Sequence, residues 1–95
     1  MRVYISGKIT GTDDYHARFA NAHTKLVASG HMVIDPVEVC SSLPRDMKHA
    51  EYMSVCIPLL MLADAVYMLK GWEQSLGARV EYRRAKERGK EIIYE

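Results

Sequence analysis

The sequence predicts a small α/β domain in which a parallel sheet of about four strands carries helices on both faces. Short runs of apolar and β-branched residues alternate with longer segments of helical periodicity, and glycines separate several of them. Strands that alternate with helices are joined by right-handed crossovers, which makes the strands parallel. We therefore expect one doubly wound domain over residues 1–95, with strand order 2-1-3-4.

The first part of the chain predicts a strand, a turn and a helix. The strand covers residues 2–6, and Thr12 or Asp13 is expected to cap the helix, which Gly30 ends. One face of this helix is apolar at helical spacing, and its residues are Tyr15, Phe19, Ala22, Leu26 and Val27.

A second strand is predicted at residues 31–34, followed by an irregular segment at residues 37–44. The next helix is expected to begin near Arg45 or Asp46, and Pro58 should kink or restart it. The remaining elements are a strand at residues 65–69, a helix at 75–88 and a strand at 91–94.

Two glycine-containing loops follow predicted strands, at residues 7–11 and 70–77. With strand order 2-1-3-4, the sheet changes its direction of growth between the first and third strands. Ligands of such sheets bind beyond the carboxyl ends of those strands. The two loops are therefore expected to form one binding crevice.

The first loop offers backbone donors, a cation and a hydroxyl at the start of a helix. These groups suit a phosphate or the hydroxyls of a sugar, although the glycine spacing is neither that of a P-loop nor that of a dinucleotide fingerprint. The alternative is a plain strand-to-helix turn. The loop residues are Gly7, Lys8, Ile9, Thr10 and Gly11.

The second loop leads into the helix predicted at residues 75–88. The first N–H groups of a helix have no intrahelical partner and carry partial positive charge, so Ser75, Leu76 and Gly77 mark a candidate anion site. Trp72 in the same loop is either a stacking platform for a base or a half-buried loop anchor.

Glu81 lies one turn further along this helix, at the edge of the inward stripe that Ala78, Tyr82 and Ala85 mark. One interpretation is an ion pair with Arg84 or Arg88. The other is that Glu81 faces the crevice as a nucleophile or base.

Two further residues are candidates for the same crevice. Tyr4 lies inside the first strand, so its ring is expected in the core with its hydroxyl on a polar partner, such as a carboxylate across the crevice. Asp64 immediately precedes the third strand, and either caps a turn or projects toward the ligand.

Charge and composition limit the classes of ligand. The formal net charge is +1, and basic residues are interleaved with acidic ones, which argues against binding of polymeric nucleic acid. Cys40 and Cys56 lack the close pairing of a redox or zinc motif. The histidines show no metal-ligand spacing either, so no metal or cofactor is expected. They are His16, His23, His31 and His49.

The cysteine pattern and a start unlike a secretory leader predict a cytoplasmic protein, and hydropathy predicts no membrane segment. The longest apolar region, residues 55–69, is interrupted by Pro58 and Asp64. The second helix is nevertheless rich in apolar residues. Excess apolar surface on a small domain indicates a homodimer or a higher homo-oligomer.

Four stretches carry a resemblance to a known family: residues 4–11, the Gly30-His31 turn, residues 63–65 and residues 71–81. They resemble a family of small phage and prophage proteins of unknown function, which is grouped with the nucleoside 2-deoxyribosyltransferases and the deoxynucleoside 5'-monophosphate N-glycosidases. The resemblance covers nearly the whole chain and is weaker between Val37 and Ile57. It implies a flavodoxin-like fold.

The resemblance also implies roles for single residues. Glu81 would attack the anomeric carbon of a deoxyribosyl group to form a covalent glycosyl-enzyme, and Tyr4 would orient its carboxylate. Asp64 would hold the sugar or help to protonate the departing base. Ser75 would indicate a nucleoside 5'-monophosphate, because transferases that act on free nucleosides typically have an aspartate there, which would repel a phosphate. The related enzymes complete their sites with a residue from a neighbouring subunit.

Three functions are therefore compatible with the sequence. The first is a nucleotide N-glycosidase or deoxyribosyltransferase that uses Glu81. The second is a non-catalytic nucleotide sensor, which would keep both loops without depending on Glu81. The third is a protein-interaction module that uses its apolar second helix.

Overall fold

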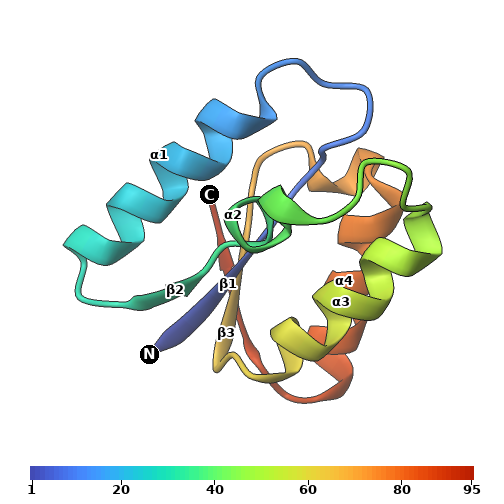
Figure 1. The fold of residues 1–95 in the computed structure, drawn as a ribbon. Coiled ribbons are helices and arrows are strands. Elements are labelled where there is room, and N and C mark those ends of the chain that lie inside the picture. The colour runs from blue at the N-terminus through green and yellow to red at the C-terminus, as the bar shows by residue number, and fades with distance from the viewer.

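The computed structural model describes residues 1–95 and contains a four-stranded parallel sheet of order β2-β1-β3-β4 (Figure 1). The strands are β1 (Arg2–Ser6), β2 (Met32–Ile34), β3 (Ala65–Met68) and β4 (Glu91–Tyr94). At the centre, Tyr4 of β1 is in register with Ile34 of β2 and Val66 of β3. The predicted fold class and strand order are thus confirmed.

Helices cover both faces of the sheet, α1 on one side and α3 with α4 on the other (Figure 1). The helices are α1 (Tyr15–Ala28), α2 (Pro36–Val39), α3 (His49–Met61) and α4 (Leu76–Glu87), with short 3-10 turns at Cys40–Ser42 and Trp72–Gln74. No helix combines the length and the apolar character that crossing a membrane requires.

Alternate residues of β1 serve the two faces of the sheet. Val3 and Ile5 belong to the core under α1, whereas Tyr4 belongs to the core under α3 and α4. This alternation follows from the period of two residues in a β-strand. All residues of β1 after Arg2 are buried, as expected for a strand paired on both sides.

The first helix differs from its prediction in its N-cap residue and in one residue of its apolar stripe. Its N-cap is Asp14 rather than Thr12 or Asp13, and the Asp14 side chain makes no capping hydrogen bond. Phe19 is buried as predicted, but Val27 is 53% exposed. Val27 directly follows the buried Leu26, and a helix turns adjacent residues in different directions.

The segment predicted as irregular contains α2. Asp35 caps this helix by accepting hydrogen bonds from the backbone N–H groups of Val37 and Glu38, and Pro36 occupies its first turn. A helix of four residues is too short to show a helical repeat in the sequence.

The third helix begins and ends later than predicted. It starts at His49 rather than at Arg45 or Asp46, and it continues through Pro58 to Met61 without ending or restarting. An internal proline costs about 3 kcal/mol through its missing N–H and its steric clash. Burial of apolar side chains on α3, including Leu60, offsets that cost.

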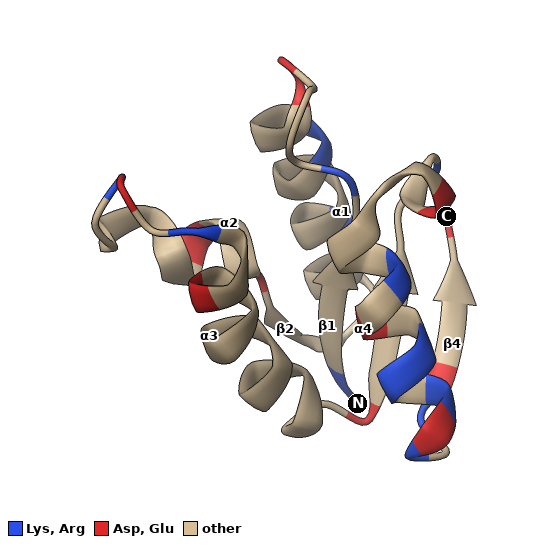
Figure 2. Ribbon diagram, turned by 90° about the vertical axis from the view of Figure 1, so that its right-hand side faces the viewer, with Lys and Arg blue, Asp and Glu red and all other residues tan.

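Charged residues are distributed unevenly over the second layer of helices. The Lys and Arg residues of α4 are exposed and lie on its outer side, whereas α3 carries no charged residue after Glu51 (Figure 2). The outer side of α4 therefore faces water, while much of α3 presents apolar side chains that are only partly buried.

Candidate active site

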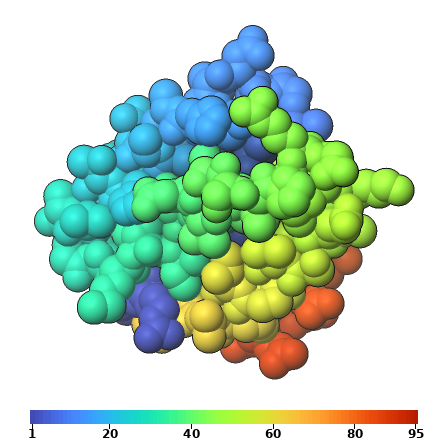
Figure 3. Space-filling model, in the orientation of Figure 1, coloured from blue at the N-terminus to red at the C-terminus, as the bar shows by residue number.

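A cavity of about 1090 Å³ opens beyond the carboxyl ends of β1 and β3. Its walls come from the loop after β1, the start of α1, the segment from α2 to α3, and the start of α4. In Figure 3, dark-blue atoms from the first residues of the chain, which include β1, are visible in a hollow between the blue start of α1 and the green segment that leads into α3. This volume is sufficient for a nucleotide-sized ligand.

Glu81 lies in the wall of this cavity and is held by two hydroxyl groups. The Tyr4 hydroxyl donates to Oε2 of Glu81 at 2.5 Å, and the Ser6 hydroxyl donates to Oε1 at 2.6 Å. Each carboxylate oxygen therefore has one neutral donor. Glu81 is only 6% exposed, so both of its oxygens are fixed inside the protein.

The fold brings these three groups together through regular spacing. Tyr4 and Ser6 are two residues apart in β1 and consequently point to the same face of the sheet. That face is covered by α4, on which Glu81 occupies the buried stripe between Ala78 and Ala85. A rigid central strand and a packed helix thus fix the geometry.

Burial dominates the ionisation of Glu81. It raises the pKa of this carboxyl group to about 6, although the hydrogen bonds from Ser6 and Tyr4 lower it. Burial, and then the charge of Glu81, raise the pKa of Tyr4 well above its usual value. The carboxyl group is therefore largely ionised at neutral pH, while the tyrosine stays protonated as a donor.

The ion pair that the sequence offered as an alternative for Glu81 does not form. Neither Arg84 nor Arg88 makes a salt bridge, and the two ion pairs of the structure both involve His23. Glu81 points inward, away from the basic outer side of α4. Within the protein, the charge of Glu81 is therefore stabilised by the Tyr4 and Ser6 hydroxyl groups and not by a cation.

The start of α4 forms a second part of the cavity wall. The Ser75 hydroxyl accepts a hydrogen bond from the N–H of Ala78 at 3.1 Å, which makes Ser75 the N-cap. Its own proton remains available for a ligand. Ser75, Leu76 and Gly77 all line the cavity. The helix N-terminus gives this part of the wall positive character, and Lys8 in the loop after β1 lines the same cavity.

Two glycines pack closely against neighbouring side chains here. A Cβ atom on Gly7 would lie 2.7 Å from Cδ1 of Leu69, so the loop after β1 could not approach β3. A Cβ atom on Gly77 would lie 3.3 Å from Cε1 of His49, which belongs to α3. Gly77 thus packs against α3 and also lines the cavity.

Most of the residues singled out in the sequence meet in the cavity wall. Nine of them line it: Tyr4, Gly7, Lys8, Ile9, Thr10, Ser75, Leu76, Gly77 and Glu81. Gly11, Trp72 and Asp64 do not.

The side chains of Trp72 and Asp64 have other partners. The Trp72 ring stacks on Tyr82 at 4.4 Å between ring centroids, which makes it a loop anchor. Asp64 precedes β3 at the amino end of the sheet, where its carboxylate accepts from the backbone N–H of Arg2 at 2.9 Å. The carboxyl ends of the strands, where the cavity lies, are at the opposite edge.

Sequence reasoning missed several residues of the wall. Ser6 is the most important, and its signal was present, because it is a polar residue two positions after Tyr4 in the same strand. Arg45, His49 and Cys56 also line the cavity. They come from residues 37–57, where neither the helical pattern nor the resemblance gave clear guidance.

Comparison with known proteins gives the family of the chain. The model of the family described as "Domain of unknown function (DUF4406)" matches residues 1–94, so the chain belongs to this family. No curated protein matches the chain.

Proposed function

Starting from a family without an assigned function, we propose that this protein cleaves or transfers the N-glycosidic bond of a (deoxy)nucleoside 5'-monophosphate through a glycosyl-enzyme on Glu81. The observation that carries the proposal is the buried Glu81 carboxylate, held by Tyr4 and Ser6 in the wall of a nucleotide-sized cavity. Fixed neutral donors on a carboxylate without a cation suit a nucleophile that must keep its charge and position.

The reaction proceeds in two displacements. A carboxylate oxygen of Glu81 forms a bond to the anomeric carbon, while the bond from that carbon to the base nitrogen breaks and its electron pair leaves with the base. The departing base takes up a proton from solvent. Water or a second base then attacks the anomeric carbon, gives up a proton to solvent and releases the Glu81 carboxylate, with overall retention of configuration.

Tyr4 and Ser6 act on Glu81 in this mechanism. Their hydroxyl groups orient the carboxylate before attack. They also stabilise the negative charge that returns to it when the glycosyl-enzyme is resolved. We assign no step to Asp64, because its carboxylate lies at the other edge of the sheet on the backbone of Arg2.

The start of α4 supports a 5'-phosphate. Ser75 presents a hydroxyl proton, and the first amides of α4 have no intrahelical partner. Lys8 adds a positive charge in the same cavity. A carboxylate at position 75 would repel a phosphate, whereas a hydroxyl donates to it, so a nucleotide is favoured over a nucleoside.

Base release is the direct test. Incubation with each deoxynucleoside and ribonucleoside monophosphate should give free base by chromatography, and Glu81→Gln should abolish its release. Glu87→Gln is the matched control, because Glu87 is an exposed carboxylate on the same helix. Mass spectrometry of acid-quenched protein should show a sugar-phosphate adduct in the parent protein alone.

Other outcomes would favour a different function. Nucleotides that raise the melting temperature without any release of base would replace the enzyme with a nucleotide sensor. Unchanged turnover in Glu81→Gln would remove Glu81 as the nucleophile. If no nucleotide binds at all, the interaction-module alternative stands.

A further inference from the structure

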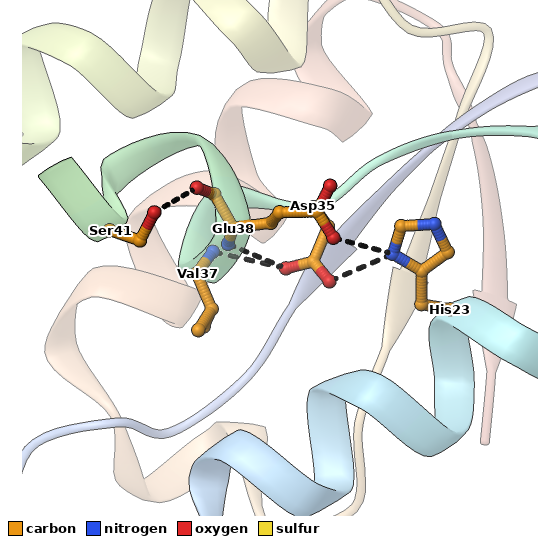
Figure 4. A network of polar contacts seen from close by, with 5 residues as sticks. All are labelled: His23, Asp35, Val37, Glu38 and Ser41. Carbon is orange, nitrogen blue, oxygen red and sulfur yellow. Dashed lines mark hydrogen bonds and ion pairs between the residues drawn. The ribbon is translucent and has the colours of Figure 1, made fainter.

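A second group of ionisable side chains lies outside the cavity just described. It consists of His23 from α1, Asp35 at the N-cap of α2, and Glu38 from α2 (Figure 4). None of the three lines the cavity with Glu81. They line a separate hollow of about 430 Å³ instead.

The ligand atoms of the three side chains converge. Nδ1 of His23 lies 3.0 Å from Oδ2 of Asp35 and 3.7 Å from Oε2 of Glu38. All three atoms lie within 4.8 Å of one another. Figure 4 shows the imidazole pointing from α1 toward both carboxylates. One imidazole nitrogen and two carboxylate oxygens are a ligand set that zinc accepts.

We propose that His23, Asp35 and Glu38 bind a divalent transition-metal ion, with Zn²⁺ as the preferred ion. Zinc binds nitrogen and oxygen ligands tetrahedrally at about 2.0–2.2 Å, which places neighbouring ligand atoms roughly 3.3–3.6 Å apart. The two distances from His23 are close to that range. A small rotation of Glu38, whose side chain is 75% exposed, completes the triangle.

The hydrogen bonds of Asp35 leave one oxygen for the metal. Its Oδ1 accepts from the backbone N–H groups of Val37 at 3.0 Å and Glu38 at 3.4 Å. Oδ2 is directed at His23 instead. Backbone donors that fix a carboxylate in this way are typical of the shell that orients metal ligands.

Charge also favours a cation at this position. With a neutral imidazole, the three side chains carry two negative charges, and no lysine or arginine pairs with either carboxylate. The simpler arrangement is a His23 N–H that donates to Asp35. A metal ion would take the place of that proton, and the adjoining hollow would supply water as the remaining ligand.

The sequence did not indicate this site because its ligands are not arranged at a regular short spacing. Asp35 and Glu38 are three residues apart, but α1 supplies His23. Only the return of the chain through β2 brings the imidazole to the carboxylates. The proposal concerns binding alone and does not depend on the proposed enzymatic function.

Calorimetric titration of metal-free protein with Zn²⁺ tests the proposal. We expect one ion per chain, and visible absorption of bound Co²⁺ without a charge-transfer band from thiolate. His23→Gln and Glu38→Gln should each weaken Zn²⁺ binding by more than about tenfold, the lower bound for loss of a residue that only supports a metal ligand. Glu38 is exposed, so its variant should fold normally.

Two controls separate this site from other zinc-binding groups. His31→Gln removes a histidine outside the cluster, and the double variant Cys40→Ser/Cys56→Ser removes both thiols. Both should keep the affinity of the parent protein. Absence of zinc binding, undiminished binding in His23→Gln and Glu38→Gln, or loss of binding with the thiols would each overturn the proposal.

Discussion

Removal of either hydroxyl that holds Glu81 should shift the pH dependence of the proposed reaction. In Tyr4→Phe or Ser6→Ala, one oxygen of the buried carboxylate loses its donor. A hydrogen bond to a charged group is worth about 1.5–3 kcal/mol, and one pKa unit corresponds to about 1.4 kcal/mol. The pKa of Glu81, about 6 in the parent protein, should therefore rise by roughly one to two units.

The direction of the change in rate follows from the role proposed for Glu81. A carboxylate nucleophile must be ionised, so kcat/KM should rise with pH through the pKa of the carboxyl group and then level off. In each variant this acid limb should move upward by roughly one to two units, with a large loss of activity at pH 6 and a smaller loss at pH 9.

Profiles of kcat/KM between pH 5 and 9 measure the shift, and NMR titration of the Glu81 carboxyl carbon measures the pKa directly. Tyr82→Phe is the matched control, because its hydroxyl contacts Tyr94 rather than Glu81. An acid limb that stays in place in both Tyr4→Phe and Ser6→Ala would refute the reasoning.

Three further predictions concern stability and assembly. Folding raises the pKa of Glu81 from 4.5 to about 6, so the folded state holds this proton more tightly than the unfolded state. The free energy of unfolding should therefore fall by about 2 kcal/mol as pH rises through this interval. Denaturant titrations of Glu81→Gln should not show this fall. Gly7→Ala should lower the free energy of unfolding by about 1–3 kcal/mol, because its Cβ would meet Leu69 at 2.7 Å; an unchanged denaturation midpoint would contradict this. We propose that the chain forms a homo-oligomer through the apolar side of α3, so light scattering should give more than one chain per particle. Leu62→Glu should yield monomers, whereas Val27→Glu, which also changes an exposed apolar residue, should not. A monomeric parent protein would exclude this oligomer.

The sheet could be predicted because its signals are local and repeated. Each strand is a short apolar run, each crossover has a helical pattern, and the strand order identified the edge at which two loops meet. The structure of residues 35–48 was harder to predict from the sequence. The helix α2 has only four residues, too few for a helical repeat to appear, and it depends on a cap from the side chain of Asp35.

The partners of individual side chains were harder to predict from the sequence than the fold. Glu81 was placed only at the edge of a stripe, since helical spacing alone does not show whether neighbouring strand residues offer donors. Asp64 was assigned to the ligand from its resemblance, but its position before β3 puts it at the amino edge of the sheet. Because β3 runs away from Asp64 toward the cavity, the Asp64 side chain lies at the end of the strand that is far from the cavity.

The central position of β1 protects the cavity wall around Glu81 from local unfolding. β1 pairs with both β2 and β3, and its buried residues belong to both cores, so opening it requires disruption of the whole sheet. Tyr4 and Ser6 should therefore keep Glu81 in place until the protein unfolds globally. The segment between α2 and α3 has fewer buried residues and can open locally. A ligand could thus enter and leave through that wall while the carboxylate stays fixed.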